Sequence, residues 1–199
     1  MPLWVWIFIV LAAALFGLKL TYVVSTGLVL PITQGAVYVS SSRVRIAAFL
    51  DAVPMPAGQL LIDLGCGDGR VLRQARARYD VRAVGYEINP LAYLQARLRC
   101  WGLKDVGIRR QNFWRTRLSE ADVVFCYLYP DVMGRLSDKL NAELKPGAVV
   151  VSCNFALPGW TPAKVVRPGS SLHNDPIFIY KAGAQAPPPP KLTEGLFGR

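Results

Sequence analysis

The chain has 199 residues, enough for one ordinary domain with an appendage and a buried core. Its 23 Lys and Arg residues outnumber 13 Asp and Glu, and the formal net charge of +10 favours anionic surroundings such as phospholipid headgroups, nucleic acid or an acidic protein. A solubilising surface rich in arginine is the alternative. The four cysteines are far apart and form no C-x-x-C pair, which argues against a zinc site or a disulfide framework and predicts reduced thiols.

Residues 1–24 differ from the rest of the chain in being almost wholly apolar. No charged side chain occurs before Lys19, and the length is close to the roughly 20 residues that cross a bilayer core. Trp4 and Trp6 would lie at one membrane interface and Tyr22 near the other, which is typical of aromatic residues in membrane helices. We therefore predict a transmembrane anchor, with the lipid bilayer as a partner.

Two alternatives to the anchor are weaker. A cleaved signal peptide has a basic region before its apolar core, and none precedes this segment. A helix buried in a soluble core is less consistent with a segment that is apolar on every face. Positive charge follows the segment at Lys19, Arg43 and Arg45, so we predict a single pass with the following domain on the cytoplasmic side, or in an equivalent reducing compartment.

Residues 25–57 read as a linker with one short helix at 44–53, which the preceding "SSS" would cap. From residue 58 to residue 182, apolar runs alternate with amphipathic segments, the pattern of a parallel sheet covered on both faces. The predicted strands are 60–64, 81–86, 106–111, 121–127 and 147–154, and the predicted helices are 69–79, 90–101 and 131–144.

After Phe155 the alternation ends. The stretch "ALPGWTP" is too short and too rich in Pro and Gly for another full helix, so strands near 163–167 and 176–181 are expected to close the sheet as an antiparallel pair. Residues 183–199 contain four consecutive prolines and read as an extended, loosely ordered tail. The predicted fold class is α/β: a Rossmann-like, doubly wound, mostly parallel sheet of about seven strands, preceded by one transmembrane helix.

The stretch "LLIDLGCGDGRVLRQA", residues 60–75, joins the first strand of this domain to a helix through Asp63 and three glycines. Gly65, Gly67 and Gly69 lack a Cβ and tolerate positive φ, so the backbone can pass close to a nucleoside. Glu87 ends the next strand about 20 residues further on, where an acidic side chain binds ribose hydroxyls. The pattern therefore predicts a nucleoside-binding turn.

Spacing and charge distinguish two nucleoside cofactors. Dinucleotides use G-x-G-x-x-G and place a pyrophosphate at the helix N-terminus, which carboxylates such as Asp63 and Asp68 would repel. The spacing here is G-x-G-x-G. Its carboxylates suit a ligand that carries an ammonium and a sulfonium, which describes S-adenosylmethionine.

At these residues the chain resembles the class I, seven-strand S-adenosylmethionine-dependent methyltransferases, over about residues 58–155. Asn112, at the end of the third strand in "RRQNFW", matches the usual contact to the adenine amino group, with a turn-forming Asn as the alternative. The resemblance implies the other cofactor contacts: Gly65 and Gly67 under the cofactor with Gly69 completing the turn, Asp63 and Asp68 near the methionine moiety, and Glu87 on the ribose.

In this family the end of the fourth strand usually faces the transferring methyl group. The residues there, "CYLYP", lack the [DN]-P-P-[YFW] signature, which argues against methylation of DNA adenine or glutamine. Tyr127 and Tyr129 are the predicted catalytic residues because their hydroxyls accept hydrogen bonds and their rings attract cations, with core packing as the alternative. Trp114 and Trp160 are predicted either to line a substrate channel or to fill the core. His173, the only histidine, acts as a general base or occupies a surface turn.

A wider set of motifs narrows the resemblance. The apolar N-terminal segment, "YVSSSRV", "DLGCGDGR", "GYEINP", "NFW", "YLYPDVMGRLSDKLNAELKPG" and "CNF" together resemble the membrane-anchored protein-lysine methyltransferases of mitochondria and their prokaryotic relatives, over about residues 36–165. The mitochondrial enzymes modify the ATP synthase c-subunit or the adenine nucleotide translocator. Two features depart from that family: Asn112 stands where Asp is more usual, and Ser40 and Ser41 replace a Pro-Thr type motif.

The resemblance implies a membrane-anchored, S-adenosylmethionine-dependent methyltransferase that acts on a lysine of a membrane or membrane-associated protein. A desolvated pocket lowers the pKa of a lysine without a dedicated base. A small-molecule or lipid methyltransferase and a non-catalytic S-adenosylmethionine-binding module are the alternatives. Nucleic acid is not expected as a partner because no track of clustered Arg and aromatic residues is evident. No metal is expected, and residues 28–42 are a candidate lid.

Overall fold

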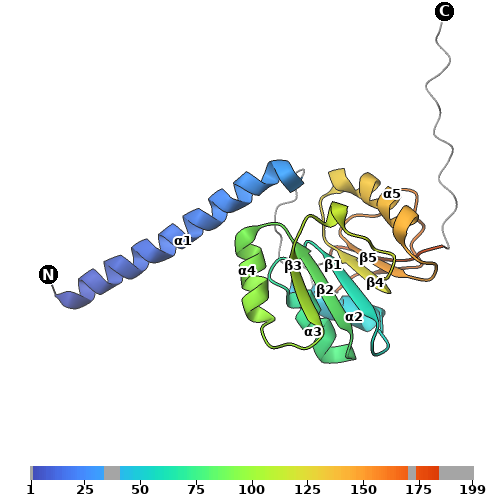
Figure 1. Ribbon diagram of the computed structural model, residues 1–199, viewed down its shortest axis with the longest axis horizontal. Helices are drawn as coiled ribbons and strands as arrows, with labels where there is room; N and C mark the ends of the chain where they lie inside the picture. The colour runs from blue at the N-terminus through green and yellow to red at the C-terminus, as the bar shows by residue number, and fades with distance from the viewer. Residues whose placement is uncertain (1, 34–40, 170–173, 184–199) are drawn as a thin grey trace, which may run out of the picture.

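A seven-stranded sheet organises the chain, of which the computed structural model describes residues 2–33, 41–169 and 174–183 (Figure 1). The strand order is β3-β2-β1-β4-β5-β7-β6. Strands β1 to β5 pair in parallel, and β7 lies antiparallel between β5 and β6, which confirms the mostly parallel α/β sheet with an antiparallel last pair. The strands are β1 (Leu60–Leu64), β2 (Arg82–Glu87), β3 (Val106–Arg110), β4 (Val123–Cys126), β5 (Val149–Cys153), β6 (Lys164–Val166) and β7 (Ile177–Lys181).

Helices cover both faces of the sheet, as the alternating pattern predicts. One buried apolar cluster includes side chains of α2 (Arg43–Ala52), α3 (Arg70–Tyr79) and α4 (Pro90–Arg99), and a second includes those of α5 (Met133–Glu143). Phe49 links α2 to β4, since its ring centroid lies 5.1 Å from that of Phe125. All five residues of β1 are buried because this central strand is covered on both sides.

Two short 3-10 helices are not evident from the sequence pattern. They are η1 (Phe113–Arg115) and η2 (Pro130–Val132). Three residues are too few to show an apolar period. Because η2 precedes α5, that helix begins at Met133 and not at the predicted residue 131. The fourth strand is Val123–Cys126, shorter than the predicted 121–127.

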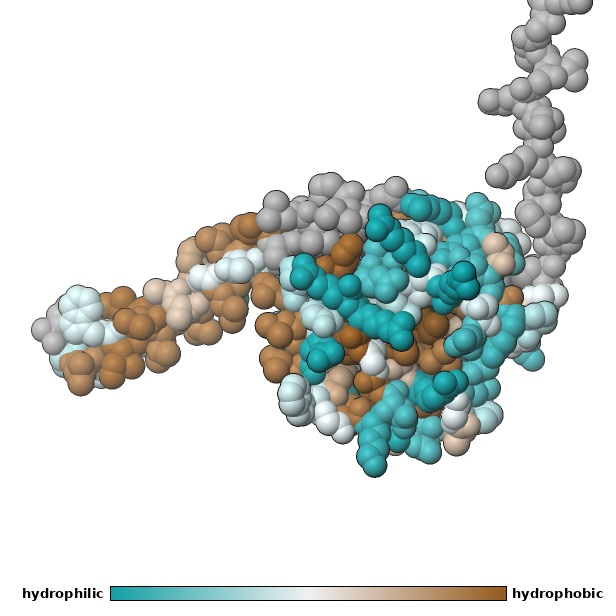
Figure 2. Space-filling model, viewed as in Figure 1, coloured by the Kyte–Doolittle hydropathy of each residue, from teal (hydrophilic) through white to brown (hydrophobic). Residues whose placement is uncertain are grey.

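Helix α1 (Leu3–Thr33) projects away from the sheet, and its surface is mostly hydrophobic (Figures 1 and 2). Within it, Leu3–Val24 is 22 residues long with a mean hydropathy of 2.3, and none of its most apolar part is buried in the protein. Among the described residues this is the one helix long and apolar enough to cross a membrane, although a signal sequence has the same length and composition. The helix continues to Thr33, so the predicted end of the anchor at residue 24 falls inside it.

Candidate active site

The loop between β1 and α3 adopts a backbone conformation that favours glycine. Gly65, Gly67 and Gly69 have φ of 85°, 55° and 73°, in the left-handed region that costs other residues about 1–2 kcal/mol. The backbone N–H groups of Gly65 and Cys66 both donate to the Tyr86 carbonyl, at 2.9 and 3.0 Å, so β2 fixes the loop. The glycine turn is therefore confirmed as a turn, and its contact with a cofactor stays a prediction.

Glu87 at the end of β2 connects this loop to α4. One carboxylate oxygen accepts from Gly67 N at 2.9 Å and the other from Asn89 N at 2.7 Å. Asn89 caps α4, where its side-chain oxygen accepts from Leu91 N at 3.0 Å. Glu87 is 7% exposed. The two oxygens together offer four lone pairs, one more than the three backbone hydrogen bonds from Gly67, Asn89 and Ile88 require, so an acceptor position remains for a ribose hydroxyl.

The buried carboxylates make this end of the sheet electronegative. Asp63, on β1, is 2% exposed, and burial together with the negative charges of Glu87 and Asp68 raises its pKa well above the usual value. Burial also raises the pKa of Glu87, against the backbone hydrogen bonds from Asn89, Gly67 and Ile88 that favour its ionised form. A cation placed here would lower both pKa values, so the site fits a ligand with an ammonium or a sulfonium.

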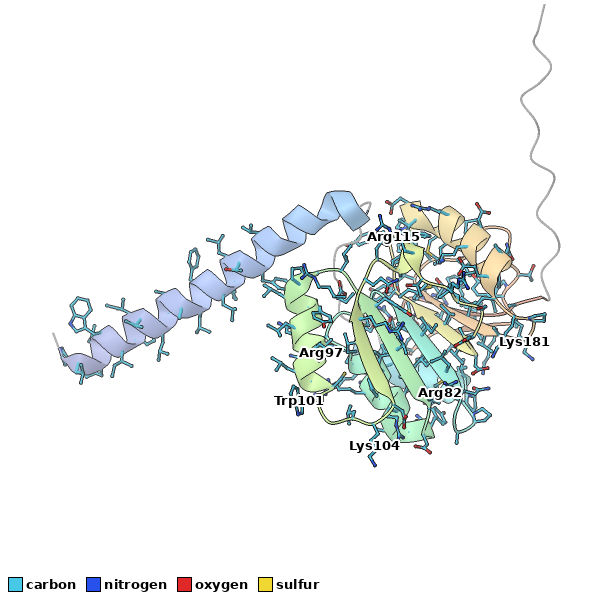
Figure 3. All side chains as sticks on the ribbon, viewed as in Figure 1. Arg82, Arg97, Trp101, Lys104, Arg115 and Lys181 are labelled. Atoms are coloured by element: carbon cyan, nitrogen blue, oxygen red, sulfur yellow. The ribbon has the colours of Figure 1, made fainter. Side chains whose placement is uncertain are left out.

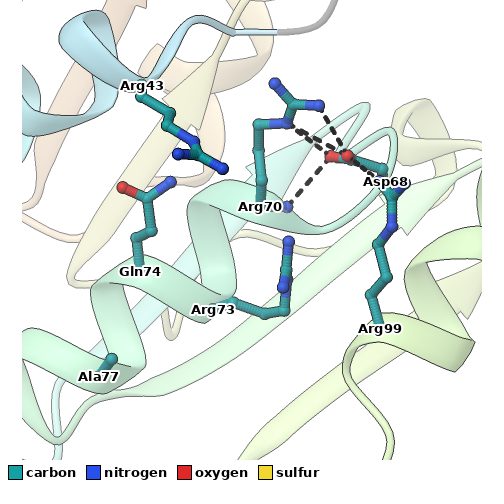
Figure 4. Close-up of a pocket in the computed structure, with 7 residues that line it drawn as sticks. All are labelled: Arg43, Asp68, Arg70, Arg73, Gln74, Ala77 and Arg99. Carbon is teal, nitrogen blue, oxygen red and sulfur yellow. Dashed lines mark hydrogen bonds and ion pairs between the residues drawn. The ribbon is translucent and has the colours of Figure 1, made fainter.

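Asp68 differs from the other two carboxylates because arginines neutralise it. Arg70 binds it through Nη2 at 2.8 Å, and Arg99 forms a second ion pair (Figure 4). Burial would raise its pKa, but the hydrogen bonds and charges of these two arginines lower it. The repulsion expected for a pyrophosphate therefore depends on Asp63 and Glu87. The placement of Asp68 near the methionine moiety stays a prediction.

Asp68 also lies at the edge of a cleft of about 620 Å³ on the helical face of the domain (Figure 4). Arginines dominate its walls, and none of the other predicted cofactor or catalytic residues lines it. Its lining includes Arg43 of α2, Arg73 of α3 and Arg99 of α4. The cleft is therefore a basic surface next to the glycine turn.

Tyr127 follows β4 and is half-buried between two polar partners. Its hydroxyl accepts a hydrogen bond from Asn154 Nδ2 at 3.3 Å. The guanidinium of Arg45 lies 4.6 Å from its ring centroid, and Arg45 Nη2 pairs with Asp175 at 2.7 Å. The ring does bind a cation, as predicted, but that cation is the Arg45 guanidinium of α2. The hydroxyl, in contrast, can accept a second hydrogen bond.

Asn154 is a candidate that the sequence analysis does not assign. It follows β5 with φ of 70°, which is uncommon for a residue other than glycine. Its Oδ1 is buried and has no hydrogen-bond partner among the described residues. A polar residue at the carboxyl end of a predicted parallel strand, here the last residue of the predicted strand 147–154, is the signal that would have indicated it.

Two of the other candidates precede the short 3-10 helices, and a third lies in the core. Asn112 caps η1, with its Oδ1 accepting from Trp114 N at 3.0 Å, so the turn-forming alternative is confirmed and the adenine contact stays a prediction. Tyr129 is half-buried at the start of η2 and makes no capping hydrogen bond. Trp160 is 6% exposed and meets Tyr180 edge-on, which confirms core filling. His173 lies outside the described residues.

Parallel pairing brings the main candidates to one edge of the sheet. Asp63 and Glu87 lie at the carboxyl ends of β1 and β2, whereas Tyr127 and Asn154 follow the carboxyl ends of β4 and β5. These four strands are neighbours in the order β2-β1-β4-β5. Ligands of open α/β sheets bind at this edge, where the chain crosses to opposite sides of β1.

Comparisons with known proteins give a consistent set of relatives. A family model described as the ANTKMT methyltransferase domain matches residues 63–164. The chain is 34% identical over 160 residues to the adenine nucleotide translocase lysine N-methyltransferase of Mus musculus, covering 79% of this chain and 68% of the mouse protein. It is 33% identical over 150 residues to a protein-lysine N-methyltransferase of Saccharolobus islandicus, covering 73% of this chain and 93% of that protein.

A solved structure extends the similarity to three dimensions. An RNA methyltransferase from Salinibacter ruber, in complex with S-adenosyl-L-homocysteine, matches with a TM-score of 0.69 at 29% identity, covering 76% of this chain and 98% of that chain. Its ligand is the product that S-adenosylmethionine leaves after losing the methyl group. The family match begins at Asp63 and includes Glu87, Tyr127 and Asn154.

Proposed function

The chain belongs to the family of the ANTKMT methyltransferase domain, and we propose that it is a membrane-anchored protein-lysine N-methyltransferase. Membership makes it an S-adenosylmethionine-dependent methyltransferase of class I fold. Membership of the family does not by itself establish the lysine substrate or the membrane anchor, and both are part of the proposal.

The observation that carries the lysine assignment is the similarity to two lysine N-methyltransferases. One of them, from Mus musculus, is aligned over 79% of this chain, and the other, from Saccharolobus islandicus, is itself covered to 93%. The shared region therefore includes the whole sheet edge rather than the glycine turn alone. A protein of which the match covers 93% is named for lysine methylation, which supports the same activity here.

The cofactor-binding side of the site follows from the glycine turn and the buried carboxylates. When bound, S-adenosylmethionine supplies an electrophilic methyl group, and a new N–C bond forms as the C–S bond breaks and positive charge passes to nitrogen. We assign the ribose to Glu87 and the close backbone approach to Gly65 and Gly67. Asp63 would offset the positive charge of the ligand, because an ionised carboxylate stabilises a nearby cation in a site with little water.

The substrate side is built from Tyr127 and Asn154. The Tyr127 hydroxyl and the unpaired Asn154 Oδ1 are hydrogen-bond acceptors at the end of β4 and β5. An amine that is about to attack carries N–H groups that need acceptors, and two acceptors fix the direction of its lone pair. Alignment of amine and methyl group supplies much of the rate in such a displacement. Removal of either acceptor should therefore slow transfer more than it weakens cofactor binding.

The membrane anchor is proposed for α1. Its apolar length supports this, and the positive charge at Lys19, Arg43 and Arg45 supports a domain on the cytoplasmic side. Confinement of enzyme and substrate to one surface raises their effective concentration without added contacts. A membrane or membrane-associated protein is therefore the proposed substrate class.

RNA methylation is the second candidate, because the matching solved structure is an RNA methyltransferase. It ranks below lysine methylation since the lysine enzymes are more similar in sequence, at 33–34% against 29% identity. Radiolabelled S-adenosylmethionine separates the candidates. The full chain is incubated with cell membranes and with total RNA, and the label is counted in protein, lipid and RNA fractions.

Label in protein, located on lysine by mass spectrometry, is the expected result. It should disappear with Glu87→Ala and Tyr127→Ala and persist with Glu120→Ala, which changes an exposed glutamate away from the site. Label confined to RNA would replace the proposal with the second candidate. Label in lipid would make the protein a lipid methyltransferase, and cofactor binding without transfer to any fraction would make it a binding module.

A further inference from the structure

Helix α4 carries an apolar face that the fold leaves exposed. Outside α1, four of the six described large apolar side chains with high exposure lie on α4 or in the turn after it. They are Leu94 at 52%, Leu98 at 63%, Trp101 at 79% and Leu103 at 40% exposed. Val44 and Val165 are the other two and lie elsewhere. Single exposed apolar residues need no explanation, but a contiguous group indicates an interaction site.

The spacing of these residues places them opposite the buried face of the helix. Leu94 and Leu98 are four residues apart on α4 and so lie on one stripe along the helix axis, and Trp101 follows in the turn after the helix ends at Arg99. Ala92 and Ala96, both fully buried, form the stripe that packs on the sheet. The exposed apolar stripe is therefore separate from the apolar core. It points away from the domain.

Basic side chains border the apolar stripe. Arg97 and Arg99 are exposed on α4, and Lys104 follows in the next turn. Figure 3 shows Arg97, Trp101 and Lys104 along this outer part of the domain. Apolar and aromatic side chains on one face with Arg and Lys beside them are typical of helices that lie in the interface of an anionic membrane. The formal net charge of +10 is of the same sign.

The exposed stripe lies next to the anchor. Helices α1 and α4 contact each other, and α4 runs across the direction of α1 at the side of the domain toward which α1 extends (Figure 1). Figure 2 shows hydrophobic atoms at this edge of the domain, below the base of α1, with hydrophilic atoms interleaved. A helix that runs across a membrane-spanning helix lies along the membrane surface.

We propose that the outer face of α4 binds the surface of an anionic lipid bilayer, at the interface from which α1 emerges. This inference rests on the proposed anchor. Leu94, Leu98 and Trp101 would enter the headgroup region, and Arg97 and Lys104 would pair with lipid phosphates. Two attachments hold a domain in one orientation, whereas α1 alone leaves it free to turn. The carboxyl edge, from which α4 starts three residues after Glu87, is then held beside the bilayer.

Hydrogen exchange of the full chain tests this proposal in lipid nanodiscs and in detergent. The discs contain either phosphatidylcholine alone or phosphatidylcholine and phosphatidylglycerol in about equal parts. We expect the amides of α4 and its following turn to exchange about tenfold more slowly in the anionic discs than in detergent. The double variant Leu98→Glu/Trp101→Glu should lose this protection. Val165→Glu, at an apolar position on β6 that is 46% exposed, should keep it.

Three controls distinguish the possible failures. Resistance of the chain to alkaline carbonate extraction reports the anchor, and unchanged S-adenosylhomocysteine affinity shows that each variant is folded. If the chain is extracted, the proposed anchor is wrong. If it resists extraction but α4 exchanges alike in discs and detergent, the inference is wrong and the anchor stands. Protection that appears in detergent together with a dimer would assign the face to a second copy and overturn the inference.

Discussion

Substitution of Glu87 by Gln tests the cofactor-binding side of the site with the smallest change in shape. Besides a backbone hydrogen bond from Ile88, one carboxylate oxygen accepts from Gly67 N at 2.9 Å and the other accepts from Asn89 N at 2.7 Å. A glutamine has one carbonyl oxygen and one amide group, so one of these two N–H groups must face a donor. The variant therefore loses one backbone contact and the proposed acceptor for a ribose hydroxyl.

The contacts give the expected magnitudes. A buried N–H left without a partner costs about 1–3 kcal/mol. Loss of the negative charge beside Asp63 offsets part of that cost, because the Glu87 charge raises the pKa of Asp63. We therefore expect the free energy of unfolding to fall by about 1 kcal/mol, which lowers Tm by roughly 2–4 °C for a chain of this size. Cofactor affinity loses a charge-assisted hydrogen bond without compensation, about 1.5–3 kcal/mol or roughly 10–150-fold.

Calorimetry with S-adenosylhomocysteine and thermal unfolding without ligand measure the two effects separately. Glu120→Gln is the control, since this exposed glutamate should change neither quantity. The expected signature is a large loss of affinity with a small loss of stability. Unchanged affinity in Glu87→Gln, with the fold intact, would refute the assignment of Glu87 to the ribose and with it the nucleoside position.

Three further predictions address other parts of the site. Tyr127→Phe should lower kcat at least about tenfold with little effect on S-adenosylhomocysteine affinity, and an unchanged kcat would exclude the hydroxyl from amine alignment. Gly69→Ala should destabilise the fold by about 2 kcal/mol in denaturant titrations, because φ is 73° and the added Cβ would approach the Cys100 sulfur to 2.9 Å. Gly134→Ala is the control and should not destabilise the fold, since nothing is found within 4 Å of a Cβ added there. Affinity for S-adenosylmethionine should fall as pH is lowered through the raised pKa of Asp63, and a pH-independent affinity in calorimetry would contradict that role.

The elements of the sheet were predictable because each is an apolar run with a clear boundary. β1 lies at 60–64 as predicted, and α3 and β2 begin within one residue of their predicted starts. The glycine turn and Glu87 were also predictable, since a cofactor loop and the acidic strand end are close in sequence. The insertion of β7 between β5 and β6 was not, because an apolar pattern specifies a strand without specifying its neighbour.

The polar network around Tyr127 shows why the rest of the site was not predictable. Arg45 pairs with Asp175, which is 130 positions away, and Asn154 donates to Tyr127 across 27 positions. No local pattern marks such partners, because folding alone brings them together. The same holds for Asp68. Its carboxylate reads as a free charge in "GCGDGR", but Arg99 reaches it from α4, 31 positions away, and changes its electrostatic role.

The sign of the Asp63 pKa links the stability of the fold to the proposed chemistry. Its folded pKa lies above its unfolded value, so between the two values the folded state binds more protons and the free energy of unfolding falls as pH rises. Above the unfolded pKa of Asp63, the ligand-free fold is thus less stable than it would be with an unperturbed carboxyl group. A bound cation reverses this effect, since it stabilises the ionised form and lowers the pKa. Asp63→Asn should therefore raise Tm without ligand and reduce the additional rise that S-adenosylmethionine produces, a combination that a merely structural aspartate would not give.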